Sequence, residues 1–542
     1  MHKNRPEAQM IFLVVAIFFI AFLAAPLLIL LANSFVTGQG SGLSNYIEVL
    51  GDKSVAAAIS NSIQVSATAA VITTLLAFML AYAVNCTKMC NGLKMLIKIG
   101  ISIPMLLPTI TYGFAIIYSF GKQGLLTKFF GMELFQIYGF NGLLMGYVIY
   151  TLPSAFLLLN NSFGYIDKKF IIVSTLMGDD FFRSFINTIL RPLIGTIGGA
   201  LVLSFILSFT DFGIPASVGG TYNVIATQLY QVMLGSIPNF QSGSVIAVLM
   251  LLPAILGVLF LNYLERFNFH YDGFSVTELP DNKLRDLAFA FVSVVTVTGI
   301  ISVFLVMFIA PLVKNYPYDL TFTTQFIQQA LFSSALLDVY ENSVFVAIIS
   351  AVLGTLIAYS AAIINVRTLM SKRAKISIDL FSMITNSVPG MVLGLAYLLL
   401  FNASDLKGTF MIIILCNIVH FFTTPYLMAK NSLSKLNPAW ETTGELMGDT
   451  WIKTIIRVII PNSVATIVEM FGYYFINTMV TISAIIFLVT ARTSVVTSKI
   501  KELQHFANFN EIFVLSILIF VTNISIKICC DLVNQKLTSD YR

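Results

Sequence analysis

The sequence predicts an all-α membrane protein of about 12 transmembrane helices, built as two parallel six-helix repeats. Three observations lead to this fold class. Only 11% of the 542 residues are charged and 57% are hydrophobic, whereas a soluble domain has about 25% charged residues. The apolar residues gather in separate long runs, and short motifs recur at a spacing of about half the chain. This composition excludes a soluble fold.

Each predicted span is an apolar run long enough to cross a bilayer as a helix, in which the backbone amides are paired internally. The predicted spans of the first half are Met10–Leu31, Ile63–Val84, Ile99–Phe120, Leu143–Leu159, Leu193–Val218 and Val245–Leu264. Those of the second half are Leu287–Val313, Val344–Ile364, Phe381–Phe401, Thr409–Met428, Ser463–Val489 and Ile512–Cys530. The first run is too long for a signal-peptide core, so we expect it to be retained.

The loops between the predicted spans differ in charge. If the N-terminus is cytoplasmic, most of the 31 Lys and Arg residues fall on the cytoplasmic side, which is the bias that sets orientation in membranes. We therefore expect a multi-pass protein of a bacterial cytoplasmic (inner) membrane, with both termini in the cytoplasm. The net charge of +5 is small and scattered, so the lipid bilayer is an expected partner and nucleic acid is not.

Matching motifs in the two halves indicate a duplication. They occur in the same order in both: Ala25–Leu27 with Ala310–Leu312, Asn61-Ser62 with Asn342-Ser343, Pro108 with Pro389, and Leu176–Asp179 with Leu446–Asp449. Because each half has an even number of predicted spans, both halves enter the membrane from the same side, as parallel repeats do. We divide the chain into a first repeat, residues 1–275, and a second, residues 276–542, and expect a pathway at their interface.

Two long cytoplasmic connections lie at equivalent places, after the fourth predicted span of each half. Each contains the motif Leu-Met-Gly-Asp, with Gly178 in the first and Gly448 in the second, and each ends in a proline, Pro192 or Pro461. A glycine permits a sharp turn between short helices, and a proline suits the start of the next helix. We predict a helical hairpin in each connection, exposed for docking.

At these residues the chain resembles the permease subunits of binding-protein-dependent ABC importers, whose signature in this loop is E-A-A, then Gly, then I-x-L-P. Gly448 to Pro461 has the family spacing, and Gly178 to Pro192 is one residue longer. Neither loop keeps the E-A-A itself, and Glu441 stands one place early. The resemblance implies a fold like that of type I ABC importer permeases, with these loops as coupling helices that contact ATPase subunits.

The resemblance also implies partners. They are two cytoplasmic ATP-binding subunits, which hold ATP and Mg, and an extracytoplasmic substrate-binding protein. The chain has no G-x-x-x-x-G-K-[ST] motif of its own, so we expect a transport subunit with no catalytic residues, no cofactor and no metal site. The implied ATPase-coupling residues are Leu176, Met177, Gly178, Asp179, Pro192, Glu441, Leu446, Met447, Gly448, Asp449 and Pro461.

Two further stretches indicate which permeases within this class the chain resembles. Thr210–Pro215, followed by Gly219-Gly220, and Met479–Leu488 in the second half resemble the fused, two-repeat permeases of the ferric iron and 2-aminoethylphosphonate type. This likeness implies ferric iron or a phosphonate as the transported substrate.

Polar residues within the predicted spans are candidates for the pathway, because ionisable groups are costly in a membrane. Asp211 either lines the pathway or caps a helix, since Gly213 and Pro215 predict a break there. Glu469 either lines the pathway or pairs with a neighbouring span. Thr481, at the repeat position of Asp211, and nearby Ser483 complete the candidates.

The sequence favours two other interpretations less strongly. His420 could ligate a metal, but a lone histidine without carboxylate or cysteine neighbours favours a packing role. An ion-gradient-driven secondary transporter also has six plus six spans. Its usual glycine-aspartate-arginine loop after the second span finds no counterpart here, since Asn85–Lys98 contains neither Asp nor Arg.

Overall fold

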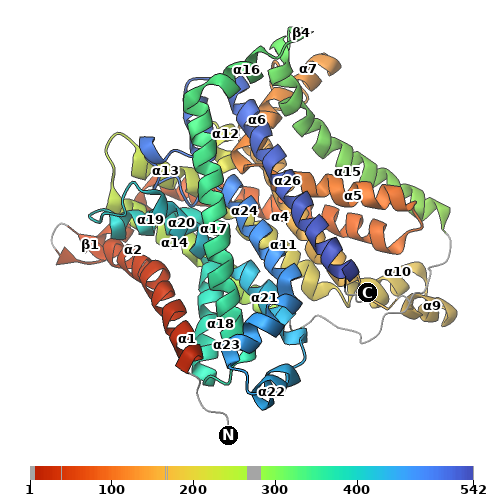
Figure 1. The fold of residues 1–542 in the computed structure, drawn as a ribbon. Coiled ribbons are helices and arrows are strands. Elements are labelled where there is room, and N and C mark those ends of the chain that lie inside the picture. Colours follow the sequence, from red (N-terminus) through yellow and green to blue (C-terminus); the bar gives the residue numbers. More distant parts are fainter. Residues whose placement is uncertain are drawn as a thin grey trace.

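The computed structural model describes residues 6–37, 40–164, 166–167, 169–264, 266 and 282–540. Helices dominate it, as predicted (Figure 1). The helices of the first half are α1 (Pro6–Phe19), η1 (Ile20–Ala24), α2 (Ala25–Phe35), α3 (Ser44–Gly51), α4 (Lys53–Cys86), α5 (Asn91–Ser102), η2 (Ile103–Leu106), α6 (Thr109–Phe120), α7 (Leu125–Phe130), α8 (Phe140–Phe163), α9 (Lys169–Leu176), α10 (Phe181–Phe185), η3 (Ile186–Leu190), α11 (Ile194–Thr210), α12 (Gly213–Val218), α13 (Ile225–Leu234) and α14 (Phe240–Leu264).

The second half repeats much of this order. Its helices are α15 (Lys283–Ile309), η5 (Ala310–Leu312), α16 (Gln325–Phe332), α17 (Ser334–Arg367), α18 (Lys372–Ser387), α19 (Gly390–Phe401), α20 (Phe410–His420), α21 (Thr423–Lys435), α22 (Ala439–Leu446), α23 (Trp451–Thr454), η6 (Ile455–Ile459), η7 (Pro461–Ser463), α24 (Val464–Val480), η8 (Ala491–Thr493), α25 (Val496–His505) and α26 (Phe509–Asp540). Two small antiparallel hairpins, β1 (Val36–Thr37) with β2 (Gly40–Ser41) and β3 (Val313–Asn315) with β4 (Asp319–Phe322), follow the first span of each half.

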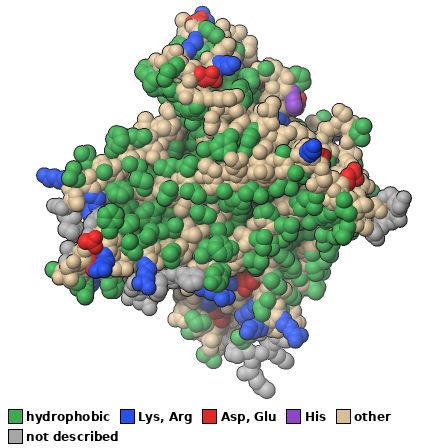
Figure 2. All heavy atoms as spheres, turned by 180° about the vertical axis from the view of Figure 1, so that it is seen from behind, with side chains coloured by type: hydrophobic (Ala, Val, Ile, Leu, Met, Phe, Trp, Pro, Cys, Tyr) green, Lys and Arg blue, Asp and Glu red, His purple; other side chains and the backbone are tan. Residues whose placement is uncertain are grey.

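The described residues form seven helices that are long and apolar enough to cross a membrane, or up to 12 spans when each of five bent helix pairs counts as one. The prediction of about 12 spans agrees with the larger number. Figure 2 shows hydrophobic side chains over the middle of one face, with most charged side chains around its margins. This distribution suits a surface that lies in lipid.

Two of the predicted spans, Ile99–Phe120 and Phe381–Phe401, are wrong as continuous helices. The chain bends by 110° between η2 and α6, and by 106° between α18 and α19. The cause is Pro108 in one half and Pro389 in the other. Proline removes a backbone donor and disfavours a helical conformation in the residue before it.

Three more predicted spans are broken or end early. The predicted span Thr409–Met428 bends by 52° between α20 and α21. The helices α11 and α24 end at Thr210 and Val480, well before the predicted ends, because Asp211 and Thr481 are extended, with ψ near 139° and 138°. Beyond the first break, the segment 219–244, which carries no charged residue, contains α13.

Paired elements of the two halves have matching lengths. The helices α4 and α17 have 34 residues each, and α11 and α24 have 17 each. The residues that follow α4 and α17, Thr87 and Thr368, have almost the same backbone angles. These pairs support the duplication, while the boundary between residues 275 and 276 lies outside the described residues, so that division stays a prediction.

Each half sends its first span across to the other half. The α1–α2 span of the first half packs on α17 and α19, and Phe19 contacts Phe422, the residue before α21, at 4.4 Å between ring centroids. The α15 helix of the second half packs on α4 and α6, where Phe304 contacts Tyr112 at 5.1 Å. The two halves are therefore interlocked, and a central region is left between them.

Candidate functional site

A cavity of about 450 Å³ lies between the two halves. Helices of both halves line it, mainly η2, α6, α8 and α11 of the first and α18, α19, α20, α21 and α24 of the second. Its polar lining residues are Thr109, Tyr112, Tyr150, Ser154, Thr210, Asp211, Thr385, Asn386, Ser387, His420, Thr423, Thr424, Tyr473, Asn477, Thr481 and Ser483. Many of these residues lie beside the helix breaks, because a break frees polar backbone that must face a cavity rather than lipid.

Asp211 lines the cavity, and its carboxylate also caps a helix, while its place in the transport pathway stays a prediction. It follows the last residue of α11, and its Oδ2 accepts a hydrogen bond from the backbone N–H of Ile214 at 2.8 Å. Gly213 is required beside it, because a Cβ atom there would lie 2.1 Å from the Thr109 hydroxyl oxygen. The first turn of α6 thus packs directly against the break that holds the carboxylate.

The second half places Thr481 and Ser483 on the same cavity. Thr481 follows the last residue of α24, as Asp211 follows that of α11. Ser483 and His420 both approach Gly390, whose ideal Cβ position lies 2.7 Å from the serine Oγ and 3.2 Å from the histidine Nε2. His420, for which we favoured a packing role, therefore also lines the cavity.

Glu469 lies elsewhere. It is absent from the cavity lining, and its Oε1 accepts a hydrogen bond from Asn534 Nδ2 of α26 at 3.4 Å. Glu469 thus pairs with a neighbouring span, and its place in the transport pathway stays a prediction. Among the described residues, no group of three or more His, Cys, Asp and Glu side chains is placed to hold a metal ion.

The predicted hairpins are present in both halves. The first hairpin, residues 169–192, turns at Gly178 with φ of +86°, and the second, residues 439–461, turns at Gly448 with φ of +79°. The residue after each glycine closes the helix before it, with Asp179 N donating to Ser174 O at 3.1 Å and Asp449 N to Gly444 O at 2.9 Å. Glycine is favoured because this C-terminal cap needs a left-handed residue.

The residues just before each glycine form an exposed apolar tip. The side chains are exposed by 82% and 80% at Leu176 and Met177, and by 85% and 78% at Leu446 and Met447. Both hairpins lie toward the same end of the molecule as the N-terminus (Figure 1). Large apolar side chains that are this exposed outside the spans are typical of surfaces that bind other proteins.

Each hairpin leads directly into a helix that lines the cavity. A π-helical turn precedes each proline, with Arg191 N donating to Ile186 O at 2.8 Å and Ile460 N to Ile455 O at 2.9 Å. Pro192 and Pro461 then mark the bends, of 70° and 44°, into α11 and α24. Each hairpin is therefore almost continuous with a helix that lines the cavity.

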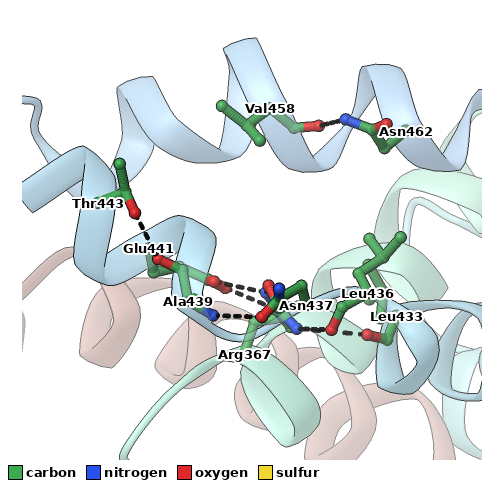
Figure 3. Close-up of polar contacts among 9 residues, drawn as sticks. All are labelled: Arg367, Leu433, Leu436, Asn437, Ala439, Glu441, Thr443, Val458 and Asn462. Atoms are coloured by element: carbon green, nitrogen blue, oxygen red, sulfur yellow. Dashed lines mark hydrogen bonds and ion pairs between the residues drawn. The ribbon is translucent and has the colours of Figure 1, made fainter.

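Arg367, which sequence reasoning did not single out, holds the second hairpin (Figure 3). Its guanidinium forms a two-pronged ion pair with Glu441, through Nε to Oε1 at 2.5 Å and through Nη2 to Oε2. The side chains are only 4% and 15% exposed. Glu441, predicted to couple to an ATPase, therefore faces inward. One feature of the sequence could have indicated Arg367. It is a charged residue at the end of a span, and the equivalent span of the first half has no charged residue at its end.

Interlocked helical halves, a polar cavity between them and paired exposed hairpins define a membrane permease. Residues 350–539 match the family described as binding-protein-dependent transport system inner membrane component. The chain is 26% identical over 510 residues to the putative ferric transport system permease protein FbpB 1 of Haemophilus influenzae, which covers 90% of this chain and 78% of that protein. It is also 26% identical over 514 residues to the ferric transport system permease protein FbpB of Actinobacillus pleuropneumoniae, covering 90% and 72%.

Residues 350–539 therefore carry a domain of this transport family, and the chain is similar over most of its length to permease subunits of binding-protein-dependent ABC importers, as the resemblance implied. It is a multi-pass inner-membrane protein and a transport subunit rather than an enzyme. Permeases of this family work with a substrate-binding protein and with ATPase subunits. The side of the membrane on which the termini lie stays a prediction.

Proposed function

We propose that this permease carries ferric iron, delivered by an external binding protein, through the cavity between its two halves. Two separate ATP-binding subunits, which hold ATP and Mg, would drive it from the cytoplasmic side, where both termini would also lie. The observation that carries the proposal is one cavity lined by both halves and linked to both hairpins. Two relatives named as ferric transport permeases favour iron over a phosphonate.

The cavity suits passage of a cation rather than its storage. Its lining offers one carboxylate, Asp211, and one imidazole, His420, among many hydroxyl and amide groups. A conducting site must bind well enough to admit the substrate and weakly enough to release it. Asp211, Thr481 and Ser483 are the lining residues for which we propose contact with the substrate.

The hairpin tips suit docking to the ATPase subunits. Leu176 and Met177 in one half, and Leu446 and Met447 in the other, would enter an apolar groove on each subunit. Gly178 and Gly448 hold the turns, and Pro192 and Pro461 direct the chain into α11 and α24. Closure of the two ATPase subunits would then move the lining helices together.

Uptake into liposomes tests the substrate. The purified complex of permease, ATPase subunits and binding protein is supplied with ATP inside the vesicles, and binding proteins loaded with ferric iron or with a phosphonate are compared. We expect iron to accumulate and the iron-loaded protein to stimulate ATP hydrolysis. Stimulation and uptake with the phosphonate alone would overturn the proposed substrate and leave the permease function standing.

A further inference from the structure

The end of α17 is fastened to the second hairpin by one side chain. Besides its ion pair with Glu441, the Arg367 guanidinium donates to the backbone carbonyls of Leu436 at 2.9 Å, Asn437 at 3.1 Å and Leu433 at 3.5 Å. The planar guanidinium of arginine offers five N–H donors in a fixed fork, which a lysine cannot reproduce. Arg367 uses this fork to hold three helix ends at one point.

The three helix ends belong to different parts of the molecule. Arg367 is the last residue of α17, Leu433 lies near the end of α21, and Glu441 lies in the first turn of α22, the helix that leads to the exposed tip. Carbonyls in the last turn of a helix have few partners within it, so the guanidinium, which shares Leu433 O with the backbone N–H of Leu436, also caps α21. At its other end, α21 begins with Thr423 and Thr424, which line the cavity.

The first half cannot form this ion pair. Because α4 and α17 have equal lengths, Cys86 ends α4 where Arg367 ends α17. Because α9 and α22 also have equal lengths, Ile171 stands where Glu441 does. Both members of the pair are thus uncharged in the first half. There the chain after α4 instead meets the opposite half, where Lys88 N donates to Asp286 Oδ2 of α15 at 3.3 Å.

We propose that Arg367 is a positioning residue for transport, which makes the second hairpin a rigid lever on α17 and α21, whereas the first hairpin meets α4 through ring contacts of Phe185 with Phe78 and Tyr82 rather than through an equivalent of the Arg367–Glu441 ion pair. This inference rests on the proposed function, because it concerns how the docked ATPase subunits move the cavity lining. It assigns the two hairpins unequal roles. Glu441 serves this clamp and does not contact the ATPase.

The test measures ATP hydrolysis and iron uptake together in liposomes holding the whole complex. We expect Arg367→Met to lower the iron transported per ATP hydrolysed by about tenfold, because a buried carboxylate that loses its partner no longer holds its position. Arg367→Lys should not restore coupling, because an ammonium cannot bridge the three helix ends. Two matched controls should keep wild-type coupling: Cys86→Met at the equivalent place, and Arg373→Met, which removes an exposed charge nearby.

A purely structural role would lower the amount of assembled complex and leave the transport per ATP unchanged, and that result would overturn the proposal. Equal uncoupling by Arg367→Met and Cys86→Met would overturn the asymmetry. Amide hydrogen exchange on the purified chain gives a readout that does not depend on transport. We expect Arg367→Met to speed exchange in residues 439–446 but not in residues 169–176, and unchanged exchange in both would contradict the clamp even if the wild-type complex moved no iron.

Discussion

Single residues at helix ends carry most of the local chemistry of this permease. Asp211 is the clearest case, because one carboxylate both caps α12 and faces the cavity. We predict that Asp211→Asn, which keeps an oxygen for the Ile214 amide, lowers iron uptake about tenfold, since a hydrogen bond to a charged group is worth about 1.5–3 kcal/mol. ATP hydrolysis should persist. Glu469→Asn, away from the cavity, is the matched control, and equal uptake by both variants would remove Asp211 from the pathway.

The hairpin glycines give a second residue-scale prediction. Gly178 and Gly448 have open space around them, so only their positive φ opposes a side chain. A left-handed backbone costs a non-glycine residue about 1–2 kcal/mol, and a β-branched residue more. Gly448→Val and Gly178→Val should therefore uncouple ATP hydrolysis from uptake in liposomes. Gly299→Val, at an open helical position of α15 without positive φ, should not. Normal transport by both hairpin variants would count against the hairpins as coupling elements.

Lys501 of α25, outside the spans, gives a prediction on pH. Its Nζ donates to Ala216 O of α12 at 3.3 Å and to Gln504 Oε1 at 2.8 Å, and burial lowers the pKa of this lysine from 10.5 to about 8. Between these two values the unfolded chain binds more protons than the folded one, so the free energy of unfolding rises with pH in that window.

Thermal unfolding of the purified chain checks this expectation. From about pH 8 to about pH 10, the midpoint of the wild type should rise relative to that of Lys501→Met, and below pH 8 the difference should be constant because the lysine is charged in both states. A difference that is constant across the whole range would show that the contact between α25 and α12 does not depend on the charge of Lys501.

At the scale of elements, the exposed hairpin tips should bind the ATPase subunits. Burying one Leu or Met side chain contributes about 1.5–3 kcal/mol, so Leu446→Asp or Met447→Asp should weaken binding of the ATPase subunit at least about tenfold. The dissociation constant, measured with the permease in nanodiscs, checks this. Leu369→Asp changes a similarly exposed leucine between α17 and α18 and serves as the control. Equal affinities for all variants would place the docking surface elsewhere.

The elements also show what a sequence can predict. The hydropathy of the sequence located nearly every span, because apolar runs of about 20 residues rarely occur outside transmembrane helices. It could not show that Ile99–Phe120 and Phe381–Phe401 each fold as two helices at more than 100° to one another. Pro108 and Pro389 were recognised as matching residues, but a proline within a span either kinks or breaks the helix, and packing against the partner half decides which.

At the scale of the whole molecule, the sequence predicted a duplication. It did not predict that the first span of each half packs on helices of the other half. Matching motifs fix the order of elements, whereas contacts such as Tyr397 OH to Phe22 O at 2.6 Å join residues far apart in the chain. The same limit applied to the site. Asp211, Thr481 and Ser483 were predicted from chain position, but His420 and the polar residues of α18 and α21 reach the cavity only through the folding of both halves around it.

The most direct test of the central claim is the energy source of transport. Iron uptake is measured in liposomes that contain the permease with its ATPase subunits and an iron-loaded binding protein, with ATP and without it, and with or without proton and sodium gradients. We predict uptake only when ATP and the ATPase subunits are present, independent of either gradient. Uptake by the permease alone, driven by an ion gradient, would contradict the account and identify a secondary transporter.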